Sequence, residues 1–246
     1  MPKTMCGKDY PDAYRDGFAD FYYERYKVTE GVLIPRPDTE LLVEAALMLC
    51  GALDSPMGDL IKLTPAISLP KISLLDLCAG TGCVGISTAN ALIKKGIEVD
   101  LTEVDISDTA LACVAENSSV CNTAVNIVKC DILSDESVGG KTYDIITSNP
   151  PYVTDQEMTE LPLSVTYEPE LALRGGVDGM VFYDRLCKIG NSVLNDGGVL
   201  VVEHGYRQQE KVIKVFEENG YCEVKGLCDY GGNPRVVAGI RRSHAG

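Results

Sequence analysis

Ile72-Ser73-Leu74-Leu75-Asp76-Leu77-Cys78-Ala79-Gly80-Thr81-Gly82-Cys83-Val84-Gly85 is the stretch that decides the fold of this 246-residue chain. A short apolar run ends in an acidic residue and a Gly-x-Gly turn, and a helical pattern follows, as in a nucleotide-binding βα unit. Gly80 and Gly82 let the backbone pass close to a ligand where a Cβ would collide. Because Gly85 completes a Gly-x-Gly-x-x-Gly spacing, the spacing alone leaves NAD open as the ligand.

Strand and helix patterns alternate from Ile72 to the end of the chain, which predicts an α/β fold with a doubly wound, mostly parallel sheet. The helical patterns and the seven predicted strands alternate as follows: strands at 72–78, 98–104, 125–129, 143–148, 198–204, 221–228 and 235–241, and helices at 84–95, 108–121, 179–194 and 208–219. The last two strands are too close for a helical crossover, so we expect them to be antiparallel. Ligands of such sheets bind beyond the carboxyl ends of the strands.

A second motif, Asn149-Pro150-Pro151-Tyr152, follows the apolar run at 143–148. An amide or aromatic amino nitrogen is a poor nucleophile, because its lone pair is delocalised, so a catalyst must hold both of its hydrogens. The Asn149 side-chain oxygen can accept one N–H and the Pro150 carbonyl the other, while Tyr152 lies against the flat face of the substrate. Taken alone, the motif is equally a stiff Pro-Pro turn. Together, the two motifs predict an S-adenosylmethionine (SAM) site beside a target-nitrogen site, since hydride transfer has no use for the second one.

Acidic residues at two further strand ends complete the predicted cofactor site. Asp105 ends the second strand, about 23 residues after Gly82, near the spacing at which an acidic residue binds a ribose hydroxyl. Glu103 is the other candidate for this ribose contact. The alternative for Glu103 is a charged side chain on the face of the sheet. Asp131 can accept from an adenine amino group while Ile132 packs on the ring; a turn or capping aspartate is the alternative. His204 is interpreted as a structural histidine, and no catalytic base is assigned.

Composition agrees with a soluble cytosolic enzyme and suits a basic protein partner. The formal charge of −14, from 22 Lys and Arg against 36 Asp and Glu, repels nucleic acid on average and favours a basic protein partner. No apolar signal core is present at the N-terminus, and the most apolar helix candidate, 41–53, is too short for a bilayer, so a cytoplasmic location without membrane contact is predicted. The ten cysteines form no Cys-x-x-Cys pair, which favours reduced thiols and predicts no metal.

The motifs resemble those of the PrmC/HemK family of protein-glutamine N5-methyltransferases. The matching segments cover the chain from about residue 20 onward: Leu33-Ile34-Pro35-Arg36-Pro37-Asp38-Thr39-Glu40, Asp76-Leu77-Cys78-Ala79-Gly80-Thr81-Gly82, Asn149-Pro150-Pro151-Tyr152, Tyr167-Glu168-Pro169-Glu170-Leu171-Ala172-Leu173, Val202-Glu203-His204-Gly205 and Asp229-Tyr230-Gly231-Gly232-Asn233-Pro234-Arg235. The resemblance implies a Rossmann-like methyltransferase that modifies the Gly-Gly-Gln glutamine of class I peptide-chain release factors and thereby modulates translation termination.

Residue by residue, the resemblance assigns roles to both sites. It implies SAM contacts at Cys78, Ala79, Gly80, Thr81 and Gly82, a ribose contact at Asp105 and an adenine-side contact at Ile132. It implies that Asn149 touches both ligands and that Pro150, Pro151 and Tyr152 complete the glutamine site. Arg36 is expected either to order the loop over the site or to form a surface salt bridge.

The N-terminal region departs from the family pattern, in which a helical domain of several dozen residues helps to bind the release factor. Residues 1–53 are expected to form a shortened helix and hairpin region, 54–71 a linker, and 72–246 the methyltransferase domain. Tyr10, Tyr14 and Phe18 are spaced for one face of a short helix that packs on the catalytic domain, and 21–28 resembles the family's hairpin.

Three other functions stay open at this point. An adenine-N6 nucleic-acid methyltransferase shares the Asn-Pro-Pro-Tyr logic but needs base flipping and a basic channel, which the acidity of the chain disfavours. Methylation of a glutamine in another protein is the second. A SAM-binding scaffold that no longer recruits substrate is the third, and the intact Asn149 and Tyr152 argue against it.

Overall fold

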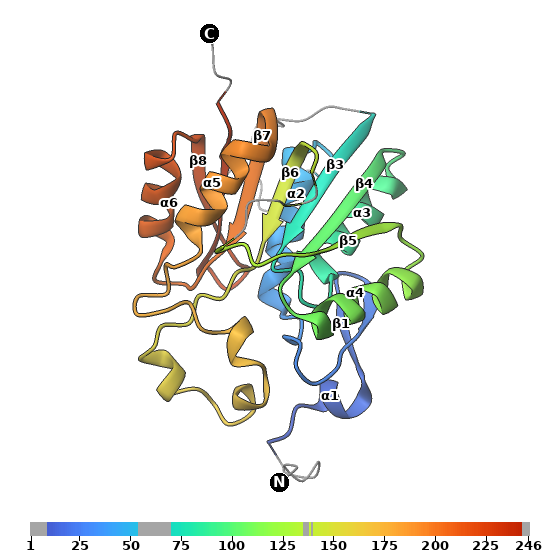
Figure 1. The fold of residues 1–246 in the computed structure, drawn as a ribbon, viewed down its shortest axis with the longest axis vertical. Helices are drawn as coiled ribbons and strands as arrows, with labels where there is room; N and C mark the ends of the chain where they lie inside the picture. The colour runs from blue at the N-terminus through green and yellow to red at the C-terminus, as the bar shows by residue number, and fades with distance from the viewer. Residues whose placement is uncertain (1–8, 54–69, 135–137, 139, 243–246) are drawn as a thin grey trace.

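The computed structural model describes residues 9–53, 70–134, 138 and 140–242. Its centre is a seven-stranded sheet in the order β5-β4-β3-β6-β7-β9-β8 (Figure 1). The strands are β3 (Lys71–Leu77), β4 (Glu98–Asp105), β5 (Val125–Lys129), β6 (Tyr143–Ser148), β7 (Leu194–Glu203), β8 (Cys222–Cys228) and β9 (Pro234–Ile240). β3 to β7 pair in parallel, and β9 is antiparallel to both β7 and β8. The predicted α/β fold and the antiparallel last pair are confirmed.

Helices cover both faces of the sheet (Figure 1). The α-helices that flank it are α2 (Glu40–Leu49), α3 (Cys83–Lys94), α4 (Asp108–Val120), α5 (Tyr183–Val193) and α6 (Gln209–Glu218). Short 3-10 turns are η1 (Pro37–Thr39), η3 (Glu157–Thr159), η4 (Val165–Tyr167) and η5 (Glu170–Ala172). The prediction that α5 begins at residue 179 is wrong, because Gly179 has a φ of 73° and a left-handed residue cannot continue a right-handed helix.

Alternation along the central strands divides the core into two layers. Leu74 and Ile145 belong to the cluster that contains α2 and α3, whereas their neighbours Leu75 and Ile146 belong to the cluster that contains α5 and α6. All four side chains are fully buried, as expected for the centre of a doubly wound parallel sheet, where both faces are covered. The two apolar layers hold the strand ends, and with them the predicted site, in fixed positions.

The N-terminal segment consists of α1 (Asp12–Asp16), β1 (Phe18–Phe21) and β2 (Glu24–Lys27). β2 contacts α4, and Phe21 and Tyr26 belong to the core cluster that contains α2 and α3. The predicted hairpin is present and begins at Phe18. Tyr10 and Tyr14 are buried, and the Tyr10 ring lies 5.3 Å from that of Tyr167. The prediction that Phe18 shares their helix face is wrong: Gly17 (φ 74°) ends the helix, and Phe18 is 41% exposed in β1.

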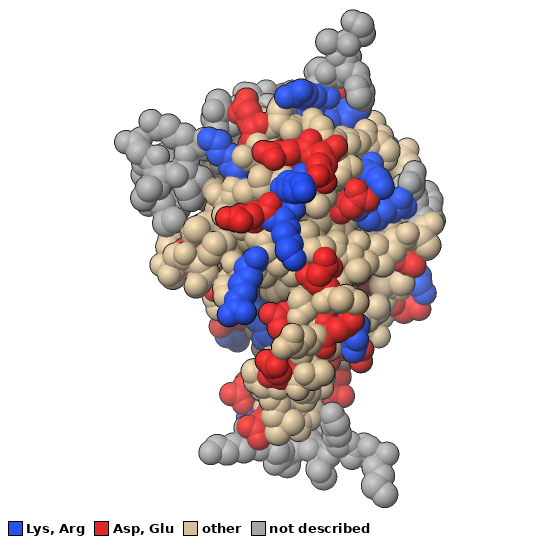
Figure 2. All heavy atoms as spheres, turned by 90° about the vertical axis from the view of Figure 1, so that its left-hand side faces the viewer, with Lys and Arg blue, Asp and Glu red and all other residues tan. Residues whose placement is uncertain are grey.

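The predicted linker falls mostly outside the described residues, since the structure describes 70 and 71 but not 54–69, and Lys71 already belongs to β3. All nine cysteines in the described segments are free thiols, five of them buried. Among the helices of these segments, none combines the length and the apolar character needed to cross a membrane. On the face drawn in Figure 2, Lys and Arg are interspersed with Asp and Glu, and they form no continuous basic stripe in the described part of that face.

Candidate active site

The turn between β3 and α3 is held in left-handed backbone conformations. Cys78, Gly80 and Gly82 have φ values of 61°, 58° and 76°. Glycine adopts such angles without cost, whereas the Cβ of Cys78 makes the same region strained, a feature often kept at functional sites. The Gly82 N–H donates to the Ala79 carbonyl at 2.8 Å and closes the turn. The turn therefore presents main chain, with little side chain, to the space beyond the strand ends.

Gly85 has a packing role in the first turn of α3. A Cβ at this position would lie 2.3 Å from the Glu103 carboxylate and 3.0 Å from the Cβ of Asp76, so only glycine lets α3 approach the sheet. Glu103 is fully buried below the helix, where burial and then the charge of Asp76 raise its pKa well above the ordinary value. Burial also raises the pKa of Asp76 to about 7, opposed by a hydrogen bond from the Thr147 hydroxyl. Glu103 lies outside the cavity lining, so Asp105 alone keeps the predicted ribose role.

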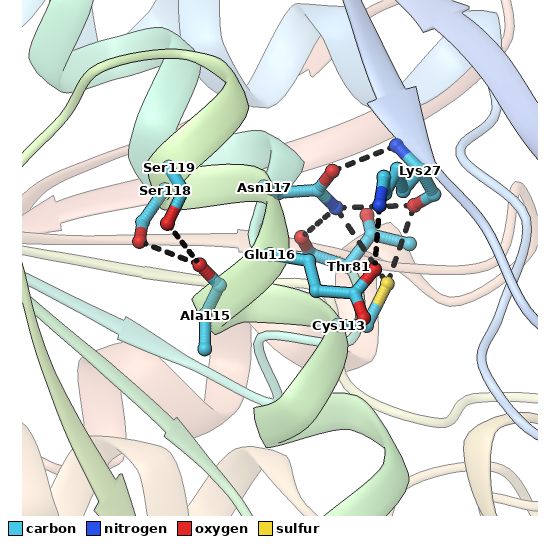
Figure 3. A network of polar contacts seen from close by, with 8 residues as sticks. All are labelled: Lys27, Thr81, Cys113, Ala115, Glu116, Asn117, Ser118 and Ser119. Atoms are coloured by element: carbon cyan, nitrogen blue, oxygen red, sulfur yellow. Dashed lines mark hydrogen bonds and ion pairs between the residues drawn. The ribbon is translucent and has the colours of Figure 1, made fainter.

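Asn117 of α4 fastens the glycine turn to the N-terminal hairpin (Figure 3). Its Nδ2 donates to the carbonyls of Thr81 (2.9 Å) and Lys27 (3.1 Å), and its Oδ1 accepts from the Lys27 N–H (2.7 Å). The Cys113 thiol also donates to the Lys27 carbonyl, at 3.2 Å. Since Asn117 is fully buried, these bonds replace water that it cannot reach, and they join β2, α4 and the turn.

A cavity of about 350 Å³ opens beside the turn at the carboxyl ends of the parallel strands. The predicted cofactor-binding residues that line it are Cys78, Ala79, Gly80, Thr81, Asp105, Asp131, Ile132 and Asn149. Gly82 does not line it and instead precedes the first residue of α3. Of the predicted substrate-binding residues, Asn149 and Pro151 line the cavity, whereas Pro150 and Tyr152 lie outside its lining. The structure thus brings most of the predicted cofactor site and half of the predicted substrate site to one cavity.

Asp105 lies at the end of β4, directly beside the glycine turn. Its Oδ2 accepts from the Gly80 N–H and its Oδ1 from the Ser107 N–H, both at 2.9 Å. Burial raises the pKa of Asp105, and these backbone N–H groups oppose that rise. Each carboxylate oxygen keeps a second lone pair, so the side chain can still accept a ligand hydroxyl.

Asp131 and Ile132 line the cavity beyond β5. Asp131 accepts from the Leu133 N–H (3.0 Å) and from the Ser134 hydroxyl (2.9 Å), which is the geometry of the alternative interpretation, a turn aspartate. This turn holds Ile132, 5% exposed, in the cavity wall. The predicted adenine contacts at both residues stay predictions.

Asn149 follows β6, and its side chain reaches an element far away in sequence. Its Nδ2 donates to Oγ1 of Thr39, the last residue of η1, at 3.3 Å. In the described part of the chain no hydrogen bond is made to Asn149 Oδ1, which leaves that oxygen available as an acceptor. The orientation matches the predicted need for an N–H acceptor at this position.

A buried carboxylate, Glu203, lies behind the Asn-Pro-Pro-Tyr segment at the end of β7. Its Oε1 accepts from the Tyr152 hydroxyl at 3.1 Å, and Glu203 is 1% exposed. Burial raises its pKa to about 7, opposed by hydrogen bonding from Thr39, the charge of Arg235 and the bond from Tyr152. Tyr152 is fastened at both ends, because its carbonyl also accepts from Gln208 Nε2 at 2.9 Å. Contact of its ring with a substrate stays a prediction.

His204 is fully buried next to Glu203 and lies outside the cavity lining. Its Nδ1 lies 2.8 Å from the Gly205 carbonyl, which can only accept, so Nδ1 carries the proton. Burial lowers the pKa of His204, which favours the neutral ring. These contacts agree with a structural histidine.

Two segments, 31–36 and 168–172, cover the cavity and form its roof, and an ion pair joins them. Arg36 pairs with Glu168, and the Glu168 Oε2 also accepts from the Ile34 N–H at 3.0 Å. The Glu168 side chain is 1% exposed and that of Arg36 38%, so the pair is more than a surface salt bridge. Of the two predicted roles of Arg36, ordering the loop over the site has the support of this geometry.

Sequence reasoning missed several lining residues. They come from the segment at 31–35, from η5 and from the start of α5, and include Val32, Leu171 and Phe182. Leu171 lies in the family-matching segment 167–173, which is the one signal that could have found it. Val32 and Phe182 have no such signal, because an apolar side chain in a cavity wall has the same sequence pattern as one in the core. Leu171 is 58% exposed although it lines the cavity, and exposure of this kind at a concave site is the cue that the structure adds.

The residues of the cavity fit SAM. The turn offers main chain without a Cβ at Gly80, where nothing lies within 4 Å of the position that a Cβ would occupy. Asp105 offers a carboxylate to hydroxyl groups, and Ile132 and Phe182 offer apolar surface. A nucleoside with a charged amino-acid end needs this combination of donors, acceptors and apolar walls.

Comparisons with known proteins agree with this assignment. A family model described as "Methyltransferase small domain" matches residues 60–165. A protein of Bacteroides thetaiotaomicron named "Release factor glutamine methyltransferase" is 34% identical over 236 residues, which are 95% of this chain and 77% of that protein. One of the same name from Haemophilus influenzae is 34% identical over 95% of this chain and 76% of its own length. Another, from Fusobacterium nucleatum, is 34% identical over 92% of this chain, which spans only 59% of its length.

Solved structures show the same fold at low sequence identity. A ribosomal protein L11 methylase from Lactobacillus delbrueckii subsp. bulgaricus has a TM-score of 0.55 at 16% identity, covering 88% of this chain and 84% of its own. The T. thermophilus 16S rRNA N2 G1207 methyltransferase has a TM-score of 0.59 at 15% identity, covering 92% of this chain and 50% of its own. Both share the arrangement of the central sheet and its flanking helices with this chain.

Proposed function

Since this chain belongs to the release factor glutamine methyltransferase family, we propose that it methylates the side-chain nitrogen (N5) of the Gly-Gly-Gln glutamine in class I peptide-chain release factors. The observation that carries the proposal is the position of Asn149. It lines the same cavity as the glycine turn, and its Oδ1 is available as an acceptor.

The proposed reaction replaces one N–H of the glutamine amide by N–CH3. When bound, SAM supplies an electrophilic methyl group on a sulfonium. The N5–carbon bond forms as the carbon–sulfur bond breaks, which leaves S-adenosylhomocysteine and a protonated N-methyl amide. That cation is so acidic that its extra proton passes to water, so the reaction requires no catalytic base.

The role proposed for the protein is to hold and polarise the target nitrogen. Asn149 Oδ1 accepts one N–H and the Pro150 carbonyl the other, and both favour the positive charge that develops on nitrogen during attack. Pro150 and Pro151 suit this role because a proline has a fixed φ and no N–H of its own to compete for the acceptors. Tyr152, fixed by Glu203, is proposed to lie against the plane of the amide.

The segment between the Asn-Pro-Pro-Tyr motif and α5 supports a basic protein substrate. Between residues 154 and 181, Arg174 is the one basic residue, and the acidic residues are Asp155, Glu157, Glu160, Glu168, Glu170 and Asp178. Pro169, Leu171 and Ala172 of this segment line the cavity, so the segment lies beside it. Glu168 is buried against Arg36, and Asp155 and Glu170 pair with Arg174, which leaves Glu157, Glu160 and Asp178 to give the segment an acidic balance. A polyanion such as RNA or DNA would be repelled here, whereas a cationic loop would be attracted. The proposed substrate acts on ribosomes, and we accordingly propose a cytoplasmic location.

Mass spectrometry of an intact class I release factor tests the proposal. The factor is incubated with SAM carrying a deuterated methyl group and with the protein or its Asn149→Ala or Asn149→Asp variant, and the Gly-Gly-Gln peptide is then sequenced. One labelled methyl group on the glutamine, made by the wild type and reduced at least about a hundredfold in both variants, is the expected result. Label on a different residue, or on adenine in a parallel oligonucleotide reaction but not on the factor, would refute the substrate assignment.

A further inference from the structure

Two polar side chains, Thr39 and Glu203, follow Asn149 in a row on the side away from the cavity. Asn149 Nδ2 lies 3.3 Å from Thr39 Oγ1, and Thr39 is 2% exposed. The Thr39 hydroxyl lies close enough to Glu203 to lower the pKa of that carboxyl group. Glu203 Oε1 also receives the Tyr152 hydroxyl at 3.1 Å. Neither Thr39 nor Glu203 lines the cavity, so neither is placed to touch a ligand in it.

The hydrogen-bond capacities of these groups determine the direction of the row. A threonine hydroxyl donates one proton and accepts with two lone pairs, while a carboxylate only accepts. Because Asn149 Nδ2 donates to Thr39 Oγ1, Thr39 presents a lone pair to Asn149 and keeps its own proton for another acceptor. Glu203 Oε2 is buried and has no hydrogen-bond partner within the described residues, so this oxygen can still accept the Thr39 proton.

The two ends of an asparagine amide have nearly the same shape, so packing alone does not decide which end points where. In one orientation Asn149 offers Oδ1 to the target nitrogen, and in the other it offers Nδ2. A target amide N–H facing Nδ2 would meet a donor, with no acceptor for its proton. An acceptor at the Thr39 position binds Nδ2 and leaves Oδ1 for the substrate.

We propose that Thr39 and Glu203 are positioning residues that hold the Asn149 amide with Oδ1 available to the target nitrogen. The inference rests on the proposed function, and it extends that function to two residues that do not touch the substrate. The same carboxylate anchors Tyr152, so Glu203 joins both halves of the acceptor site. Because Thr39 comes from η1, the loop before α2 takes part in catalysis through Asn149.

Replacing Thr39 by valine tests this directly, because valine has the same shape and lacks the hydroxyl. We expect Thr39→Val to lower kcat about tenfold, the loss of one buried hydrogen bond at the reacting group, with the Kd for SAM within about twofold of wild type. Thr39→Ser, which restores the hydroxyl, is expected to recover kcat to within about threefold. Thr88→Val is the matched control: Thr88 is a fully buried threonine of α3 whose hydroxyl donates to the Val84 carbonyl at 2.8 Å, so its loss is expected to affect stability and leave kcat unchanged.

A wild-type kcat in Thr39→Val, or an equal loss in Thr39→Ser, would overturn the inference. An equal fall in Thr88→Val would overturn it as well, because the effect would then follow from any lost buried hydroxyl.

A readout that needs no turnover separates this inference from the proposed function. The Nδ2 protons of Asn149 are followed by ¹⁵N NMR in the wild type, with Asn149→Ala used for assignment. We expect Thr39→Val and Glu203→Gln to shift these resonances and to speed their exchange with water, whereas Thr88→Val leaves them in place. Unchanged resonances in Thr39→Val would overturn the positioning role. A wild type that shows the expected resonances but methylates no release factor would refute the proposed function alone.

Discussion

Glu203→Gln is expected to stabilise the folded protein at alkaline pH while it slows methyl transfer. Glu203 is 1% exposed, and burial raises its pKa from 4.5 to about 7. Groups from several elements face it: Arg235 attracts its charge, Asp38 repels it, the Tyr152 hydroxyl donates to it at 3.1 Å, the Thr39 hydroxyl lowers its pKa, and Tyr183 and Cys83 lie nearby. The raised pKa means that burial outweighs all the favourable partners together.

The sign of the pH dependence follows from the two pKa values. In the unfolded chain the carboxyl group ionises above its ordinary pKa of 4.5, whereas in the folded protein it stays protonated up to about 7. The stabilising contribution is therefore fully present below the unfolded pKa and is lost as pH rises through the folded one. At about 1.4 kcal/mol per pKa unit, the ionised group costs about 3 kcal/mol at pH 8 relative to pH 4. A glutamine at this position carries no charge, so it has no such cost, although it loses the attraction to Arg235. We therefore expect the free energy of unfolding of Glu203→Gln to exceed that of wild type by about 1–3 kcal/mol at pH 8.

Urea unfolding of wild type and variant at pH 5, 6, 7 and 8 measures this difference, and other titrating groups cancel in the comparison. The free energy of unfolding of Glu203→Gln should rise relative to wild type between pH 5 and pH 8. Glu218→Gln is the matched control, because the Glu218 side chain is 62% exposed on α6 and its ion pair with Lys214 spans 3.6 Å. A variant that is less stable than wild type at pH 8, or whose difference from wild type stays constant with pH, would refute the assignment of a costly buried charge.

Three further changes have expected outcomes. Gly85→Ala should lower the free energy of unfolding by about 3 kcal/mol in urea titrations, because its Cβ would lie 2.3 Å from the buried Glu103 carboxylate; a loss below 1 kcal/mol would contradict the tight packing of α3. Arg36→Ala should raise the Kd for SAM about tenfold in calorimetric titration, because it leaves the Glu168 charge unpaired in the cavity roof, and unchanged affinity would show that the roof does not hold the ligand. Asp105→Asn should raise the same Kd at least about tenfold, because an amide accepts ligand hydroxyls more weakly than a carboxylate; equal affinities would remove the predicted ribose contact.

Local patterns in the sequence determined most of the secondary structure. The predicted strand at 143–148 coincides with β6 and that at 125–129 with β5, because an apolar run bounded by turns is a property of neighbouring residues. Errors arose where a backbone angle overrode the pattern. Gly17 and Gly179 both adopt left-handed angles, and these ended or delayed helices whose apolar spacing continued past them.

The candidate site was predictable only in the part that its motifs carry. The glycine turn, Asp105 and Asn149 come to one cavity because the carboxyl ends of parallel strands meet at one edge of a sheet, so motif order and strand order were enough to predict it. The supporting contacts were not predictable. Asn149 meets Thr39 across 110 residues of sequence, and Arg36 meets Glu168 across 132.

The sequence by itself thus determined the fold class, the family and most of the motif residues that line the cavity, since each of these lies in short segments with their own periodicity or spacing. Only the tertiary structure decided that Glu203 is buried behind Tyr152, that the Thr39 hydroxyl reaches Asn149, and that the loop at 31–36 roofs the cavity. The physical reason is that a hydrogen bond or an ion pair needs atoms within about 3–4 Å, and the path of each loop over the sheet sets those separations.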